Sequence, residues 1–204
     1  DVEKATVILS LDADFLCTGP AALKQARAFA SRRRAEGDRA LANRLYAVES
    51  TPTNTGSKAD HRLPLRASDI EVFATELGRW LGVADHSGGA LGLPSIANTW
   101  ARSLGVELQA HRGQSLVIAG DSQPATVHAL AHAMNDVLDN VGSTVVYTQT
   151  AEAQPTHQLD ELRELVADMN AGTVEMLLVL GGNPAYSAPA DLEFTAAMGK
   201  VPFR

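Results

Sequence analysis

Hydrophobic positions along this 204-residue chain fall into short continuous runs rather than alternating with polar ones. Runs of this length, rich in Val, Ile and Leu, are typical of strands that are buried on both faces, as in a parallel sheet. We therefore predict five strands, at residues 5–11, 44–48, 116–119, 144–147 and 175–180.

Segments with helical spacing of apolar residues separate these runs. The clearest carries Ile70, Phe73, Leu77 and Leu81 on one face. The predicted helices cover residues 20–35, 68–81, 94–104, 124–138, 159–170 and 189–198. Strands that alternate with helices predict an α/β, Rossmann-like fold, in which a mainly parallel, doubly wound sheet has helices on both faces.

A polar connection at residues 150–158 divides the pattern. We expect one Rossmann-like α/β domain over residues 1–149, and over residues 150–204 a strand–helix portion of the same domain or of an adjoining lobe. The chain begins at Asp1 without Met and ends at Arg204, where a new strand could start. It is therefore expected to be an interior fragment of a longer chain.

Composition narrows the function classes. The chain is 45% hydrophobic and 20% charged, which is usual for a globular protein. Its net charge of −7 argues against nucleic-acid partners. The single cysteine excludes an internal disulfide and an all-protein iron–sulfur site. No apolar run approaches the roughly 20 residues of a membrane span, so no direct membrane insertion is expected.

Polar residues and glycines follow the predicted strands, where open α/β sheets bind ligands. The candidate ligand pocket contains Asp12, Asp14, Glu49, Thr51, Asp121, Gly181, Gly182 and Asn183. The glycine turn at residues 181–184 permits close backbone approach to a ligand, with a simple strand-to-helix turn as the alternative. The sequence has neither GxGxxG after the first strand nor GxxxxGK[ST], so nucleotide sites of those two kinds are not expected.

Other reactive side chains lack the partners that chemistry needs. His128 and His132 have the spacing of a shared metal site, but Ala129 stands where a zinc protease needs Glu, so a surface or packing role is favoured. Cys17 has no second soft ligand and is expected to be a small packed residue. Ser122 lacks the second glycine of a nucleophile elbow. No catalytic or metal-binding residue is therefore predicted.

Several motifs, in order along nearly the whole chain, resemble those of molybdopterin oxidoreductases of the dimethyl sulfoxide reductase type. They lie at residues 12–16, 49–51, 59–66, 96–104, 140–142 and 181–184, with Thr55 between the second and the third. The phrases at residues 43–46, 49–56 and 59–64 further resemble the iron–sulfur subunit of alternative complex III. The front half of that subunit is molybdopterin oxidoreductase-like and its back half is ferredoxin-like.

The departures from the family pattern concern the cofactor. Asp12 stands where the family has a glycine after the first strand, Thr51 replaces an arginine, and Asp121 replaces another glycine. A carboxylate at Asp12 would face the pyrophosphate of the cofactor and repel it. We therefore expect no cofactor in this fragment and only a vestigial pocket, or one for another ligand.

The resemblance implies a structural module of a membrane-associated, quinol-oxidising electron-transfer complex, non-catalytic by itself. It implies iron–sulfur clusters elsewhere in the parent chain, and a location on the periplasmic side of the bacterial inner membrane. The implied partners are other domains of the same chain and the membrane and cytochrome subunits of the complex.

Two other functions stay open. One is a piece of an active molybdopterin-dependent oxidoreductase of the polysulfide or thiosulfate reductase kind. The other is a small-molecule binding module with Glu49 and Asn183 at its mouth.

Overall fold

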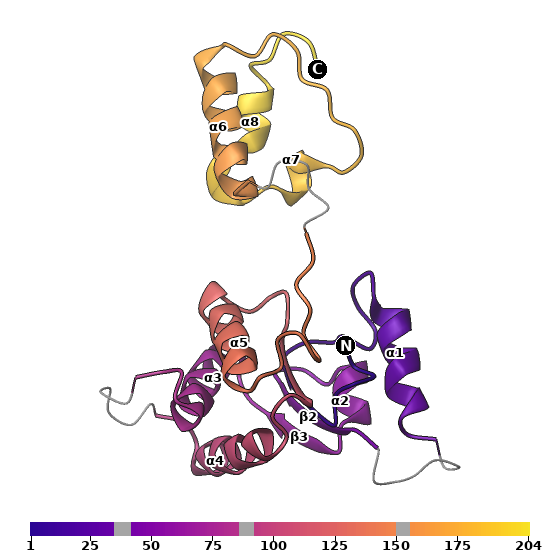
Figure 1. Ribbon diagram of the computed structural model, residues 1–204. Helices are drawn as coiled ribbons and strands as arrows, with labels where there is room; N and C mark the ends of the chain where they lie inside the picture. The colour runs from indigo at the N-terminus through magenta and orange to yellow at the C-terminus, as the bar shows by residue number, and fades with distance from the viewer. Residues whose placement is uncertain (35–41, 86–91, 150–155) are drawn as a thin grey trace. The chain divides into compact units, whose positions relative to one another are not determined.

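The computed structural model describes residues 1–34, 42–85, 92–149 and 156–204. Contacts divide the chain into two compact units, Asp1–Tyr147 and Thr148–Arg204, each shown in Figure 1 and described below by itself. Residues 150–155 of the predicted polar connection, and residue 35 at the end of a predicted helix, lie outside the described residues.

The first unit is built on a four-stranded sheet in the order β3-β2-β1-β4, with every pair of neighbours parallel. The predicted α/β, Rossmann-like fold with a parallel sheet is confirmed. The strands are β1 (Val7–Leu11), β2 (Arg44–Glu49), β3 (His61–Pro64) and β4 (Ser115–Ala119). β3 was not predicted, because only Leu63 of its four residues is buried and the strand lacks an apolar run.

Helices cover both faces of this sheet, as predicted (Figure 1). On one face lie α3 (Ala67–Leu81), α4 (Ser95–Ala110) and α5 (Ala125–Val137). The other face carries α1 (Ala22–Ser31) and the short α2 (Asn54–Lys58). The periodic residues Ile70, Phe73 and Leu77 of α3 are fully buried in the larger core, which explains why the helical spacing was readable.

The predicted strand at residues 144–147 is wrong, because side chains close the edge of β4 that it would have joined. Val117 N donates to Asn135 Oδ1 (3.0 Å), and Asn135 Nδ2 donates to Val117 O (2.8 Å). Ser115 N donates to Asn140 Oδ1 (3.3 Å). With these backbone groups already paired, the chain after α5 forms only an isolated bridge between Val141 and Val145.

The second unit is mainly helical. It contains α6 (Gln158–Ala171), α7 (Pro184–Ser187), a 3₁₀ turn (Ala190–Leu192) and α8 (Phe194–Met198). Its small core consists of Val166, Met169, Phe194, Ala197 and Val201. The helix predicted at residues 189–198 is interrupted at Glu193, whose φ of 48° is not helical.

The predicted strand at residues 175–180 is also wrong, since this segment pairs only through a single parallel bridge from Met176 to Phe203. The strand–helix portion expected over residues 150–204 is therefore helical, without a strand in its described part. Met176, Leu178 and Leu180 are 64%, 73% and 84% exposed. These side chains of the apolar run are therefore exposed to solvent, although their composition suits burial.

The longest described helix, α4, has 16 residues. Within the described ranges, none of the helices combines the length and the apolar character needed to cross a membrane.

Candidate functional site

The carboxyl ends of β1 and β4 form the place where a ligand is expected. The chain passes from β1 to β2 on one side and later reaches β4 on the other, so the strand order reverses between β1 and β4. A cavity of about 500 Å³ opens there, lined by residues 12–15, 18–21 and 118–122 together with Gln25. We call this cavity the switch-point crevice.

Asp12 is fixed at the end of β1 by contacts to two other segments. Ser50 N donates to its Oδ1 (2.9 Å), and Gln123 Nε2 donates to its Oδ2 (3.0 Å). Its φ is 56°, in the left-handed region, which aspartate tolerates better than most residues. The carboxylate therefore has a defined position beside the crevice.

Gly120 allows the two strand ends to approach closely. A Cβ at this position would lie 2.1 Å from the carbonyl oxygen of Asp12, so any other residue would push the β4 end away from β1. Gly120 N also donates to Leu11 O (2.9 Å). The missing side chain at Gly120 therefore allows the backbone after β4 to contact the backbone at the end of β1.

Two further carboxylates line the crevice. Asp14 Oδ1 accepts hydrogen bonds from Thr55 N and Thr55 Oγ1, both at 2.8 Å, which ties the loop after β1 to the start of α2. Asp121 is exposed and makes no polar side-chain contact with the described residues. The structure thus brings together three predicted residues, Asp12, Asp14 and Asp121.

Glu49 has a different environment from the one predicted, since it is buried and does not line the crevice. Thr53 Oγ1 donates to its Oε2 (2.6 Å), and Arg62 forms an ion pair with its Oε1. A Cβ on Gly56 would lie 1.9 Å from Glu49 Oε1. Glu49 therefore stabilises the junction of β2, β3 and α2.

The other predicted pocket residues are described within their own units. Thr51 is exposed. Gly181 and Gly182 both have a φ of 72°, and Asn183 precedes α7 in the second unit. Tyr186 N donates to Asn183 O (3.0 Å), so this segment is a turn that leads into a helix.

Of the isolated candidates, His132 lies on the surface of α5 with Nδ1 2.8 Å from Tyr147 Oη. Cys17 is exposed, so the prediction that it is packed is wrong; Asn54 Nδ2 donates to its Sγ (3.0 Å). Over the part of the chain that the structure describes, no group of three or more His, Cys, Asp or Glu side chains could hold a metal ion.

Gln123 is a supporting residue that sequence reasoning missed: it contacts Asp12 but does not itself line the crevice. Its side chain is only 7% exposed, and it contacts Asp12 through Nε2. Its Oε1 is buried and has no hydrogen-bond partner among the described residues. The sequence signal for it is its place three residues after Gly120, the glycine that follows β4.

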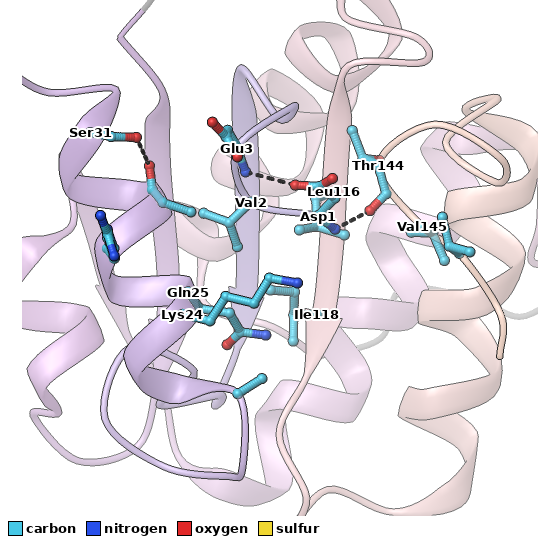
Figure 2. Close-up of a pocket in the computed structure, with 14 residues that line it drawn as sticks. Asp1, Val2, Glu3, Lys24, Gln25, Ser31, Leu116, Ile118, Thr144 and Val145 are labelled. Atoms are coloured by element: carbon cyan, nitrogen blue, oxygen red, sulfur yellow. Dashed lines mark hydrogen bonds between the residues drawn. The ribbon is translucent and has the colours of Figure 1, made fainter.

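A wider cavity, of about 700 Å³, adjoins the switch-point crevice and shares Ala21, Gln25 and Ile118 with it. Figure 2 shows it between α1, β4 and the segment around Val145, with Lys24 reaching from α1 toward Ile118. Leu116 and Ile118 line it from the sheet. Because it lies over the α1 face and not at the carboxyl edge, we place the candidate site in the switch-point crevice.

An aromatic group joins β2 and β3 to α4. The Tyr46 and His61 rings are stacked with centroids 4.6 Å apart, and Trp100 meets Tyr46 edge-on. Tyr46 Oη donates to Glu107 Oε2 (3.1 Å). Burial, and then the negative charge of Glu107, raise the pKa of Tyr46 above its ordinary value.

Comparisons with known proteins give no identity for the chain: no protein-family model matches it, and a search of the curated proteins finds no match.

Proposed function

We propose that this chain is a cofactor-free structural module of a membrane-associated, quinol-oxidising electron-transfer complex, part of an iron–sulfur subunit of the alternative complex III type. It holds neighbouring domains and the membrane and cytochrome subunits in register, on the periplasmic side of the bacterial inner membrane. The iron–sulfur clusters belong to other parts of the parent chain. The motif resemblance supplies this assignment, and the observation that carries the cofactor-free part is the anchored Asp12 carboxylate.

The crevice does not fit the pyrophosphate of a pyranopterin dinucleotide. Asp12, Asp14 and Asp121 line it, and among the described residues no lysine, arginine or histidine does. A phosphate brought within about 4 Å of a carboxylate is repelled by about 4 kcal/mol per charge pair at an effective dielectric near 20, and by less where water screens the charges. Asp12 cannot easily turn away, because Ser50 and Gln123 hold both of its oxygens.

The second unit supports a role in assembly. Leu178 and Leu180 are among the most exposed apolar side chains of the described residues, and Tyr186 of the same unit is 89% exposed. Apolar surface of this kind is typical of sites where partner proteins bind. A scaffold needs such surfaces, whereas a self-contained enzyme domain does not.

The decisive experiment is metal and nucleotide analysis of the native protein that contains this chain. We expect molybdenum and tungsten at background level and no guanine nucleotide after acid release. A molybdopterin oxidoreductase purified and processed in parallel is the positive control. Close to one molybdenum or tungsten atom per chain, with released nucleotide, would overturn the proposal and establish the active oxidoreductase instead.

A further inference from the structure

The wider cavity, of about 700 Å³, lies on the α1 side of β4, the strand at one edge of the sheet. α1 packs on this face of the sheet through Phe29, and the chain around Val145 lies on the other side of the cavity (Figure 2). Leu116 and Ile118 line it from β4, with Val145 and Val146 beside them. This space, which we call the α1 cavity, therefore has an apolar wall.

One face of α1 leaves room for a ligand. Five residues with spacings of three and four along this helix and its start line the cavity: Ala21, Lys24, Gln25, Ala28 and Ser31. The small side chains among them leave space that a leucine or a phenylalanine would fill. The volume of the α1 cavity is within the range of small-molecule sites, roughly 300–1,000 Å³.

The cations of the α1 cavity lack partners within the protein. Lys24 and Arg27 line it, and neither forms an ion pair or a side-chain hydrogen bond with the described residues. The Asp1 carboxylate is already engaged by Glu3 N (3.1 Å) and Lys4 Nζ (3.9 Å). Among the described residues, two free cations therefore face one free carboxylate, that of Glu3. This balance of charge favours a ligand with a single negative charge.

The charges and the apolar wall together select among ligands. An organic cation would be repelled by Lys24 and Arg27. A phosphate monoester carries nearly two negative charges, so Glu3 and the carboxylates of the adjoining switch-point crevice would repel it more strongly than a single charge. A small anion such as acetate would leave the wall of β4 uncovered, although burial of that apolar surface is the main source of affinity here.

We propose that the α1 cavity binds an aliphatic carboxylate, a free molecule with one negative charge at the end of a hydrocarbon chain. Lys24 and Arg27 pair with the carboxylate, and the hydrocarbon chain covers Leu116, Ile118 and Val145. Figure 2 shows Lys24 reaching from α1 toward Ile118, which brings the cation close to the apolar wall. Both cations are exposed, so the carboxylate stays at the surface while the hydrocarbon chain is buried.

Calorimetric titration of the full chain with sodium octanoate tests the proposal. We expect saturable binding of one octanoate per chain, with an affinity that falls as salt is raised, because the contact to the carboxylate is charged. Hexanoate should bind at least about tenfold more weakly, because each buried methylene group contributes roughly fourfold in affinity. Octylammonium has the same hydrocarbon chain and the opposite charge, and it should also bind at least about tenfold more weakly.

Variants at two exposed positions make the test specific. Lys24→Gln removes one cation and should weaken octanoate binding about fivefold, the upper range for an exposed ion pair. Lys58→Gln, at an exposed lysine of α2 that does not line the α1 cavity, is its matched control.

Val146→Asp places a carboxylate in the wall of the cavity and should weaken octanoate binding at least about tenfold, through repulsion and lost apolar contact. Val106→Asp on α4 is its control, because both valines are 64% exposed and Val106 does not line the cavity. Because all the substituted side chains are exposed, the variants should fold. Both control variants should bind octanoate as the unmodified protein does.

Four results would each overturn the proposal. They are no binding of octanoate, equal binding of hexanoate and octanoate, binding of octylammonium as tight as that of octanoate, and unchanged octanoate binding in both Lys24→Gln and Val146→Asp.

Discussion

The side-chain amide of Asn135 makes the two backbone hydrogen bonds to Val117 that a neighbouring strand would otherwise make, at 3.0 and 2.8 Å. Asn140 Oδ1 accepts a hydrogen bond from Ser115 N, and Asn140 Nδ2 donates to Asn135 Oδ1 (3.0 Å). Open sheet edges invite further strands. These two amides close the outer edge of β4 with side chains instead.

This pairing predicts a large loss of stability in Asn135→Leu. The variant leaves the N–H and C=O of Val117 buried and unpaired, at about 1–3 kcal/mol for each group, so we expect about 2–6 kcal/mol in total. Urea unfolding of the variant and of Asp136→Ala provides the comparison. The control changes the exposed neighbour on α5 and should stay within about 0.5 kcal/mol. A loss below about 1 kcal/mol for Asn135→Leu would mean that these bonds are not formed in solution.

Gly56 and Glu49 should be energetically coupled. Gly56→Ala places a Cβ where the Glu49 carboxylate lies and should cost more than about 2 kcal/mol, through displacement of a buried charge from Arg62. In a Glu49→Ala background the same substitution has nothing to displace, so its cost should fall by at least 1 kcal/mol. Four urea unfolding curves complete this double-mutant cycle. Additive costs would contradict the contact.

The raised pKa of Tyr46 predicts that the folded protein loses stability at alkaline pH. Its raised pKa means that the folded protein favours the neutral phenol. The resulting stabilisation is complete below the unfolded pKa of about 10 and is lost as pH rises through the higher folded pKa. Ultraviolet titration should show one tyrosine that ionises at a higher pH than the others, and Tyr46→Phe should remove that step. Tyr186→Phe, at an exposed tyrosine, is the control and should leave the late step in place.

Leu177 and Leu178 are adjacent but differ in burial, so we expect a lysine at each position to affect the stability of the second unit differently. Leu178 is 73% exposed, whereas Leu177 packs against the core that includes Met169. Leu178→Lys should leave hydrogen exchange of the α6 amides unchanged. Leu177→Lys should accelerate it at least tenfold, because burying a lysine beside this small core costs more than about 1.4 kcal/mol. Equal acceleration by both variants would show that the segment is packed on both sides.

The parallel sheet was predictable because a strand buried on both faces needs a mainly apolar run, and β1, β2 and β4 have one. Such a run indicates suitability for burial and does not say what covers it. Residues 144–147 have the composition of a strand, but Asn135 and Asn140 already occupy the edge of β4. The run at residues 175–180 lacks the neighbours that would make it a strand.

The candidate site was predictable in its position along the chain. Parallel strands share one carboxyl edge, which brings Asp12, Asp14 and Asp121 to one cavity. The burial of Glu49 depends on Gly56, which supplies room from a different element. The contact between Gln123 and Asp12 joins residues 111 positions apart, and no local pattern encodes it.

The central position of β1 also bears on how the protein is made. β1 leaves the ribosome first among the described strands, yet its pairing with β4, as between Val7 and Ser115, spans 108 residues of chain. At a synthesis rate of about 5–20 residues per second, one edge of this apolar strand waits on the order of 5 to 20 s for its partner. During translation, β1 is therefore the segment of the first unit that most needs protection by a chaperone.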